Sequence, residues 1–385
     1  MNMYKQIIIP NNSQFTEKDL LAIKYFNQSF TEDELKLEYD NHTLIALLRE
    51  VDFSHFKTIA LSASRLSGNG IFNNLFESIQ KIKSYGIKGK KRNYFDYNKE
   101  RKVKNRKEKE KRRGQYFYAL DHCFSKKNNK LPNKLLNRII CDDSKNALKA
   151  LPNNCIDLIF TSPPYNFGLE YEKGEDDHFW DDYFGKLFSI FDECIRVLKY
   201  GGRVIVNLQP LFSDYIPTHH IISNYFIKNK MIWKGEILWE KNHYNCKYTS
   251  WGSWKSPSSP YLKYTWEFIE IFCKGSLKKV GKKEDITLSA EEFKKWVMAK
   301  WSIAPEREMK SFGHPAMFPK ELAERAIKLF SYKNDVVLDP FNGVGTTTLV
   351  AKELKRGYLG IDVSGEYCKK AEDRIEDSNL KIELL

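Results

Sequence analysis

The feature of this 385-residue sequence that most constrains its fold is a strand, loop, helix and strand pattern at residues 335–362. Residues 335–338 are an apolar, β-branched run typical of a buried strand, and residues 346–354 predict the helix that follows. Residues 358–361 predict a second strand of the same kind. This alternation predicts an open, mostly parallel, doubly wound α/β sheet that binds ligands at the carboxyl ends of its strands.

The loop between the first strand and its helix predicts a nucleoside site. Gly343 and Gly345 let the backbone turn tightly and come close to a ligand, and the helix start offers unpaired N–H groups. Asp362, 17 residues beyond Gly345, ends the second strand, where an acid can accept hydrogen bonds from both ribose hydroxyls. The loop lacks the Lys and Ser/Thr of a P-loop, which favours a cofactor without phosphates. A plain structural turn is the alternative.

A second motif, Thr161-Ser162-Pro163-Pro164-Tyr165-Asn166, follows a strand predicted at residues 156–160. Its two prolines fix φ and stiffen the loop. The loop presents a hydroxyl, prolyl carbonyls and an aromatic face, which are the groups needed to hold an amino group by its hydrogens and to stack on its ring. The alternative is an ordinary loop with Tyr165 packed in the core. The cofactor loop comes last in the chain, the reverse of most nucleotide-binding domains.

Together these motifs resemble those of amino-group DNA methyltransferases of the circularly permuted β type, which use S-adenosylmethionine. The resemblance runs from about residue 138 to 368. It also covers a helix at 182–198, a strand at 203–207, blocks at 236–241, 251–254 and 267–274, and a block at 314–319 with the helix after it. The resemblance implies a site of four catalytic residues, Ser162, Pro163, Pro164 and Tyr165. It implies cofactor contacts by Asp142, Thr161, His314, Phe318, Asp339, Pro340, Phe341, Gly343, Gly345, Thr346, Thr347 and Asp362.

The resemblance also implies how the sheet is completed. If residues 335–338 and 358–361 are its first two strands, the third is missing from the C-terminal part, and residues 138–141 supply it. Residues 267–274 are expected as the antiparallel strand. The expected fold is therefore a doubly wound, mostly parallel Rossmann-like sheet with one antiparallel strand, plus a helical, basic N-terminal extension.

The expected reaction is methyl transfer to an exocyclic amino nitrogen of a base flipped out of duplex DNA, with Tyr165 stacking on it. Serine before Pro-Pro-Tyr favours cytosine N4 and aspartate favours adenine N6, but exceptions leave adenine as the alternative. Methylation at cytosine C5 needs a cysteine nucleophile, and none of the 7 cysteines lies in this loop or in a Pro-Cys pair. RNA and protein-glutamine methyltransferases place the cofactor loop first, unlike this chain. A catalytically inactive DNA-binding protein with the same fold is a more remote alternative.

Charge is concentrated in one segment. Residues 81–113 hold 16 Lys or Arg against 4 acids, so their net charge of +12 nearly equals the +13 of the whole chain. With Tyr94, Phe95 and Tyr97 interleaved, this run suits a DNA backbone, although a solvated linker is the alternative. The residues expected to contact DNA are Lys99, Arg101, Lys102, Lys104, Arg106, Arg112, Arg113, Trp251, Trp254 and Lys255.

These features divide the chain into five parts. We expect a helical region at 1–80, a basic DNA-contacting segment or linker at 81–130, a catalytic half at 131–274, a short target-recognition region at 275–307, and a cofactor-binding half at 308–385. Long apolar runs, signal patterns and C-x-x-C pairs are absent, which predicts a soluble, DNA-associated protein of the prokaryotic cytoplasm without zinc, other metals or disulfides. The expected partners are double-stranded DNA and a cognate restriction endonuclease, with no membrane. Oligomeric state has no signal in the sequence.

Overall fold

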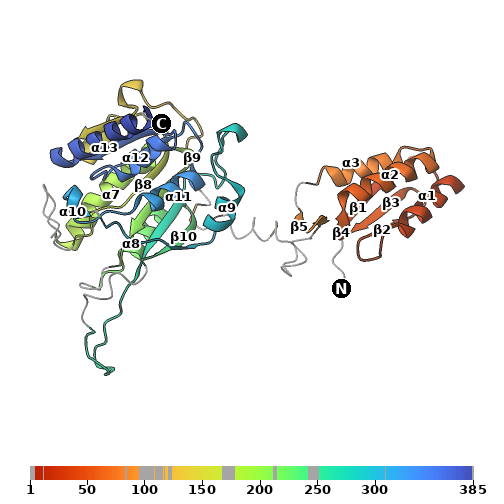
Figure 1. The fold of residues 1–385 in the computed structure, drawn as a ribbon, viewed down its shortest axis with the longest axis horizontal. Coiled ribbons are helices and arrows are strands. Elements are labelled where there is room, and N and C mark those ends of the chain that lie inside the picture. The colour runs from red at the N-terminus through yellow and green to blue at the C-terminus, as the bar shows by residue number, and fades with distance from the viewer. Residues whose placement is uncertain are drawn as a thin grey trace. The chain divides into compact units, whose positions relative to one another are not determined.

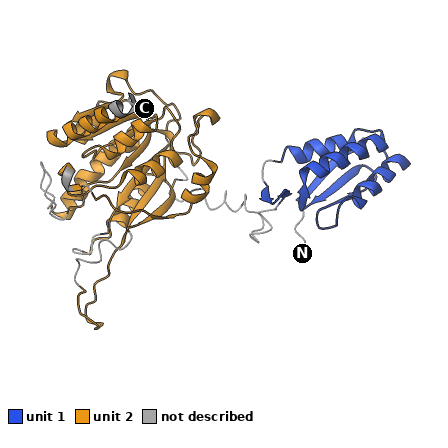
Figure 2. Cartoon of the chain, viewed as in Figure 1, with its two compact units in different colours: residues 1–113 blue, residues 114–385 orange. Residues whose placement is uncertain are grey.

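A computed structural model describes residues 5–11, 13–82, 85–94, 108, 116, 118–119, 124–166, 178–210, 215–241, 251–307 and 309–383. The chain divides into two compact units, unit 1 at Met1–Arg113 and unit 2 at Gly114–Leu385 (Figure 2). The basic residues 95–107 and 109–113 lie outside the described residues.

Unit 1 is a small α/β unit with its own core (Figure 1). One antiparallel sheet has the order β1-β3-β2, and a second has the order β4-β6-β5. The strands are β1 (Lys5–Pro10), β2 (Leu35–Tyr39), β3 (Thr43–Leu48), β4 (Glu50–Asp52), β5 (Gly86–Lys88) and β6 (Lys91–Asn93). The helices are α1 (Glu17–Gln28), α2 (Phe53–Ser67) and α3 (Ile71–Gln80).

The strands of unit 1 correct the expectation that residues 1–80 are helical. Along β3 every second residue is buried, a period of two that belongs to a half-buried strand. Tyr94, expected to interleave with DNA-facing cations, is instead fully buried in the unit 1 core.

Unit 2 is built on an eight-stranded sheet of order β12-β10-β11-β9-β8-β13-β14-β7. The strands are β7 (Arg138–Cys141), β8 (Ile156–Thr161), β9 (Leu198–Leu208), β10 (Ile232–Glu240), β11 (Trp266–Cys273), β12 (Lys300–Ser302), β13 (Val336–Asp339) and β14 (Gly357–Asp362). Strand β11 is antiparallel to both of its neighbours, and the other strand pairs are parallel. The predicted sheet with one antiparallel strand is therefore confirmed.

The sheet joins the two ends of the unit 2 sequence. Strand β14 pairs with β13 on one side and with β7 on the other, where Gly360 lies opposite Ile139. Strand β7 thus supplies the third strand, as the permuted order implies.

Helices cover both faces of the sheet, so the fold is doubly wound (Figure 1). The helices are α6 (Ser144–Lys149), α7 (Trp180–Val197), α8 (Thr218–Lys228), α9 (Ala290–Trp296), α10 (Met309–Phe312), α11 (Lys320–Phe330), α12 (Thr346–Glu353) and α13 (Gly365–Glu383), with short 3₁₀ turns η1 (Asn133–Leu135) and η3 (Lys283–Asp285). Alternate residues of β9 serve the two cores: Val204 and Val206 pack with α6, α7 and α8, whereas Ile205 packs with α9, α11, α12 and α13.

Residues 275–307, expected as a target-recognition region, contribute one short strand to this sheet. Strand β12 forms its edge beside β10, and Trp301 on β12 is 1% exposed. The Trp301 indole donates to the carbonyl of Trp296, the buried last residue of α9, at 3.0 Å. Two large buried side chains therefore anchor this segment on the sheet, whereas most of its other side chains are exposed.

No helix in the described part of the chain is both long and apolar enough to cross a membrane. The same residues contain no cluster of His, Cys, Asp or Glu that could hold a metal ion, and their cysteines are free thiols.

Candidate functional site

The two motifs meet at the carboxyl edge of the sheet because β8 and β13 are adjacent and parallel. Thr161, at the end of β8, donates from Oγ1 to Asp339 Oδ1 at 2.6 Å. Thr347, in the first turn of α12, donates to Asp339 Oδ2 at 2.7 Å. The fold therefore brings positions 178 residues apart into direct contact.

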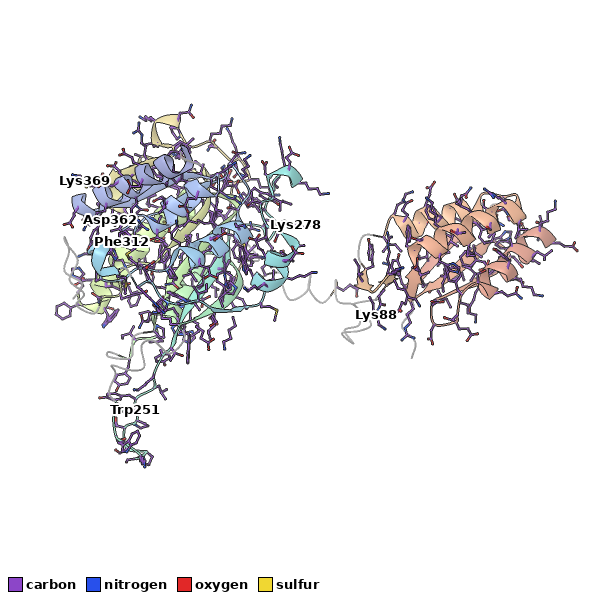
Figure 3. The ribbon with its side chains drawn as sticks, in the orientation of Figure 1. Lys88, Trp251, Lys278, Phe312, Asp362 and Lys369 are labelled. Carbon is purple, nitrogen blue, oxygen red and sulfur yellow. The ribbon has the colours of Figure 1, made fainter. Side chains whose placement is uncertain are left out.

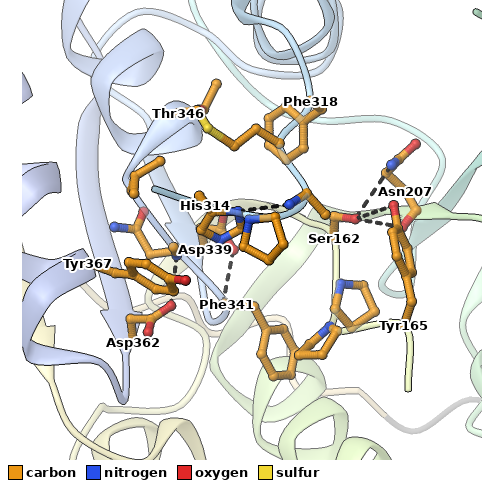
Figure 4. Close-up of a pocket in the computed structure, with 18 of the residues that line it drawn as sticks. Ser162, Tyr165, Asn207, His314, Phe318, Asp339, Phe341, Thr346, Asp362 and Tyr367 are labelled. Carbon is orange, nitrogen blue, oxygen red and sulfur yellow. Dashed lines mark hydrogen bonds between the residues drawn. The ribbon is translucent and has the colours of Figure 1, made fainter. Parts of the chain in front are cut away.

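A cavity of about 490 Å³ opens at this junction (Figure 4). Its wall holds the whole Ser162-Pro163-Pro164-Tyr165 loop and most of the cofactor residues that the sequence predicts. Those cofactor residues are His314, Phe318, Asp339, Pro340, Phe341, Gly343, Thr346 and Asp362.

The glycine loop has the conformation expected for a close backbone approach. Gly343 has φ 48°, and a Cβ there would lie 2.8 Å from His314 Nε2. The Gly343 amide donates to Asp362 Oδ2 at 2.7 Å, so the acid at the end of β14 also fixes the loop. These residues form a cradle that a larger side chain would fill.

Asp339 is a buried carboxyl with three donors. Besides the two threonines, the Phe341 amide donates to it at 3.0 Å. Burial raises the pKa of Asp339 to about 6 despite these hydrogen bonds, and the nearby Asp362 acts in the same direction. The charge on this cavity wall therefore changes near pH 6.

His314 caps the glycine loop as a neutral ring. Its Nδ1 accepts from the Ala316 amide at 3.2 Å, and its ring lies 4.7 Å from that of Tyr367. Burial lowers the pKa of His314 to about 4, so the ring is uncharged at neutral pH. A neutral His314 ring is suited to packing against a cofactor and is not suited to acid–base chemistry.

The catalytic loop is held from both sides. The Tyr183 hydroxyl donates to the Pro164 carbonyl at 2.6 Å, which occupies that carbonyl and points to Pro163 as the acceptor for a ligand. Ser162 Oγ donates to the Asn207 carbonyl at 3.3 Å, and Tyr165 OH donates to Glu267 Oε2 at 3.3 Å. Figure 4 shows Ser162 and Tyr165 on one side of the cavity and Asp362 and Tyr367 on the other.

Four predicted cofactor residues do not line the cavity: Asp142, Thr161, Gly345 and Thr347. Thr161 and Thr347 lie behind Asp339 and hold its carboxylate. Asp142 is exposed and accepts from the Asp143 amide at 2.7 Å. Strand β7 ends at Cys141, and Asp143 caps α6, so Asp143 and Ser144 reach the wall in place of Asp142.

Sequence reasoning missed several lining residues from the antiparallel half of the sheet. They are Asn207, Gln209, Trp239, Lys241 and Glu267, together with Tyr367 on α13. Their signal was modest: Asn207, Gln209, Trp239 and Lys241 are polar or aromatic residues at or near the end of β9 or β10, and Glu267 lies near the start of the antiparallel β11.

The predicted DNA contacts fall into two groups. Lys99, Arg101, Lys102, Lys104, Arg106, Arg112 and Arg113, with Phe95 and Tyr97, lie outside the described residues. Trp251, Trp254 and Lys255 lie in the connection between β10 and β11, away from the cavity wall. Figure 3 shows Trp251 on a segment that extends from the body of unit 2.

Residues 251–263 of this connection, here called the aromatic arm, expose a cluster of aromatic and cationic groups. The rings of Trp251 and Trp254 lie 5.6 Å apart and are 59% and 65% exposed. Lys263 Nζ lies 3.6 Å from the centre of the Trp251 ring, and Lys255 Nζ lies 5.6 Å from that of Trp254. Because β10 runs parallel to β8, the arm leaves the sheet at the same edge as the cavity.

The chain is similar to known methyltransferases. Over 240 residues it is 28% identical to the type II methyltransferase M.HpaI of Haemophilus parainfluenzae, covering 62% of this chain and 74% of that protein. Over 247 residues it is 28% identical to the DNA adenine methyltransferase YhdJ of Escherichia coli, covering 62% and 82%. The structure of TTHA0409 from Thermus thermophilus in complex with S-adenosyl-L-methionine is 27% identical, with a TM-score of 0.50 over 63% of this chain and 95% of that one.

The model of the DNA methylase family of N6 and N4 methyltransferases matches residues 156–373, which include the catalytic loop and the glycine loop. The cavity fits this match, because it places the cradle at Gly343 beside a Ser-Pro-Pro-Tyr loop. This chain therefore belongs to the N6/N4 DNA methylase family and is an S-adenosylmethionine-dependent DNA amino-methyltransferase.

Proposed function

We propose that this protein transfers a methyl group from S-adenosylmethionine to the exocyclic N4 of cytosine at a specific site in duplex DNA. One observation carries the proposal: the Ser162 hydroxyl opens onto the same cavity as Asp339 and the Gly343 turn. A base held by Ser162 would thus face a cofactor held by the glycine loop.

The cavity residues have distinct proposed roles toward the cofactor. Asp362 would accept from the ribose hydroxyls, since it ends β14 beside Gly343. Asp339, Pro340, Phe341 and Thr346 would form the floor, with His314 and Phe318 packing over it. Asp143 and Ser144 would replace Asp142 on the wall. When bound, S-adenosylmethionine supplies an electrophilic methyl group on a sulfonium centre.

The residues of the loop would prepare the amine for attack. An exocyclic amino group is a poor nucleophile because its lone pair is delocalised into the ring. Ser162 Oγ and the Pro163 carbonyl would accept its two hydrogens and favour a tetrahedral nitrogen. Positioning of this kind removes about 7 to 11 kcal/mol from a barrier in well-oriented reactions. Direct transfer would form the nitrogen–carbon bond as the carbon–sulfur bond breaks, would leave S-adenosylhomocysteine, and would pass one amino proton to solvent water.

Cytosine is proposed over adenine because serine stands before Pro-Pro-Tyr. A hydroxyl can both donate and accept, whereas an ionised aspartate at this position can only accept. The adenine alternative has support from the Escherichia coli relative, which is named as an adenine methyltransferase. We retain N6 of adenine as the second candidate.

DNA would be bound by the basic residues 99–113 and by the aromatic arm. We propose that the arm and the exposed side chains of residues 275–307 share the contact with the target. The type II name of the Haemophilus relative favours a restriction–modification system with a cognate endonuclease. Residues 131–274 and 308–385 are proposed as the catalytic and cofactor halves.

Mass spectrometry of nucleosides from DNA of expressing cells tests the function. We expect N4-methylcytosine in DNA from cells with the wild-type protein and much less in DNA from cells with a Ser162→Ala variant at the same expression level. N6-methyladenine would select the second candidate. If no methylated base appears, a calorimetric titration with S-adenosylmethionine tests the inactive-protein alternative: binding without methylation would support that alternative and contradict the proposal.

A further inference from the structure

A buried group of polar side chains lies behind the catalytic loop. Glu267, on β11, is 2% exposed and forms an ion pair with Lys241, which is 8% exposed. Its Oε2 accepts from Tyr165 OH at 3.3 Å and from the side-chain amide of Asn207. Glu267 thus receives three donors, one of them from the catalytic loop itself.

The hydroxyl of Ser162 has limited hydrogen-bonding capacity, which makes its neighbours important. It carries one hydrogen and two acceptor positions. The hydrogen is directed to the Asn207 carbonyl at 3.3 Å. Asn207 Nδ2 lies 3.5 Å from Oγ, and Tyr165 OH lies 3.4 Å from it. If both donated to Ser162, no acceptor position would be left for the amino group of a base.

Glu267 prevents this arrangement. An ionised carboxylate can only accept, so the Tyr165 hydrogen is directed to Glu267 and away from Ser162. Lys241 can only donate, and it keeps the negative charge of Glu267 compensated. The Asn207 amide nitrogen carries two hydrogens: it donates to Glu267, and at 3.5 Å also to Ser162 Oγ, so it fills at most one of the two acceptor positions of Ser162. Its Oδ1 is buried without a hydrogen-bond partner among the described residues.

We propose that Glu267 is a positioning residue that sets the direction of the hydrogen bonds in the catalytic loop and keeps one acceptor position of Ser162 open for the target amino group. The inference rests on the proposed function, since it takes Ser162 as the acceptor for that group. It adds a role for a side chain 102 residues from Tyr165 in the sequence.

Replacement by glutamine reverses the direction. Because Lys241 only donates, the oxygen of a glutamine at 267 faces Lys241, and its amide nitrogen faces Tyr165. Tyr165 then accepts from that amide, and its own hydrogen turns to Ser162. The acceptor position needed by the substrate is thereby filled.

The test is a set of variants measured by single-turnover methylation of duplex DNA. Glu267→Gln should lower the rate constant at least about tenfold while the Kd for S-adenosylmethionine changes less than about threefold. Adding Tyr165→Phe removes the competing donor but keeps the ring, so the double variant should be at least about threefold faster than Glu267→Gln. A role in stability alone would make the double variant slower. The proposal is overturned if the double variant is no faster than Glu267→Gln, or if Glu267→Gln has full activity.

Glu270→Gln is the matched control. Glu270 lies on the same strand and is 3% exposed, but it accepts from the Trp233 indole at 3.0 Å and does not line the cavity. We expect its turnover to match that of the wild type. A tenfold loss in this control would show that any change of a buried carboxyl side chain on β11 acts alike, and would contradict the specific role of Glu267.

Two outcomes separate this inference from the proposed function. If the wild-type protein methylates no base, the proposed function fails before the variants are compared. Should Glu267→Gln not fold, Glu267→Asp with and without Tyr165→Phe answers the question, because a retained carboxylate keeps the hydrogen-bond direction. Adding Tyr165→Phe to Glu267→Asp should then not raise the methylation rate constant, and a rate increase would refute the proposal.

Discussion

Single side chains at the cavity gain their chemistry from the groups that surround them. Asp339 is an ordinary carboxyl in the sequence, but three donors and full burial make it a group that titrates near pH 6. His314 is an ordinary imidazole, but burial keeps it neutral. Substitutions at Ser162 and at Asp339 test the roles of individual side chains directly.

Replacement of Ser162 by alanine should reduce chemistry and spare cofactor binding. The variant loses the side-chain acceptor for the amino group, and hydrogen bonds that orient a reacting group contribute about 1.5 to 3 kcal/mol. We expect kcat to fall about 10- to 100-fold, with an unchanged Kd for S-adenosylmethionine by calorimetry. Equal losses in kcat and in cofactor affinity would contradict the assigned role.

Cofactor affinity should rise with pH through the pKa of Asp339. Below about pH 6 the carboxyl is protonated and neutral, and above it the wall carries a negative charge that favours a cationic ligand. If binding lowers this pKa by about one unit, the affinity at pH 5 is about fivefold weaker than at pH 7.

Asp339→Asn provides the control for this dependence. The variant keeps a side-chain oxygen for hydrogen bonds but cannot ionise, so its affinity should not change between pH 5 and pH 7. His314 does not titrate in this window, since its pKa is about 4. A variant with the pH profile of the wild type would assign the dependence to another group.

Strands and their connections place these side chains. The ends of β8, β9, β10, β13 and β14 all reach the edge of the sheet that carries the cavity, so loops from distant parts of the chain share it. The antiparallel β11 enters from that edge, which is why Glu267, near its start, faces the loop after β8. The aromatic arm extends from the same edge.

Trp254→Ala should weaken DNA binding. The ring is 65% exposed, and stacking of a base on an aromatic side chain contributes about 1 to 3 kcal/mol. We expect at least about a fivefold higher Kd for duplex DNA in fluorescence anisotropy. Trp233→Ala on β10 is the control, because Trp233 is 52% exposed near the start of that strand, at the edge of the sheet opposite the arm. Equal effects of the two variants would remove the arm from the interface.

The whole chain combines a catalytic unit with a separate N-terminal unit that has its own core. Most of the net positive charge is concentrated in residues 81–113, at the end of unit 1. If the basic segment binds DNA as proposed, methyl transfer and affinity for the DNA backbone are supplied by different parts of the chain.

Neutralising four cations of the basic segment should change the salt dependence of DNA binding. With Arg101, Lys102, Lys104 and Arg106 changed to Gln, the slope of log K against log salt should flatten by about three to four. S-adenosylmethionine affinity should stay constant. Gln at Lys134, Lys149, Lys355 and Lys369, exposed cations of unit 2 outside residues 275–307, is the matched control, for which we expect an unchanged slope. An unchanged slope in the test variant would exclude the segment from the DNA interface.

The sequence predicted most of unit 2 and less of unit 1. Strands at 335–338 and 358–361 and the helix at 346–354 lie within one or two residues of β13, β14 and α12, because long buried runs carry a strong periodic signal. The short amphipathic strands of unit 1 carry a weak signal, and they were missed. The sequence predicted Asp142 as the cofactor residue, whereas Asp143 lines the cavity. Which of two adjacent acids reaches the cavity depends on where the helix cap forms, and Asp143 is the cap of α6.

The sequence by itself determined the chemistry: the Ser-Pro-Pro-Tyr loop, the glycine turn and the acid after the second strand are local patterns that act through their own backbone and side-chain types. Only the tertiary structure decided which groups surround them. Glu267, Lys241 and Asn207 reach Ser162 and Tyr165 through the pairing of β11 with β9 and β10. Such contacts depend on strand order and register, which are set by packing of the whole sheet and leave no mark on any short stretch of sequence.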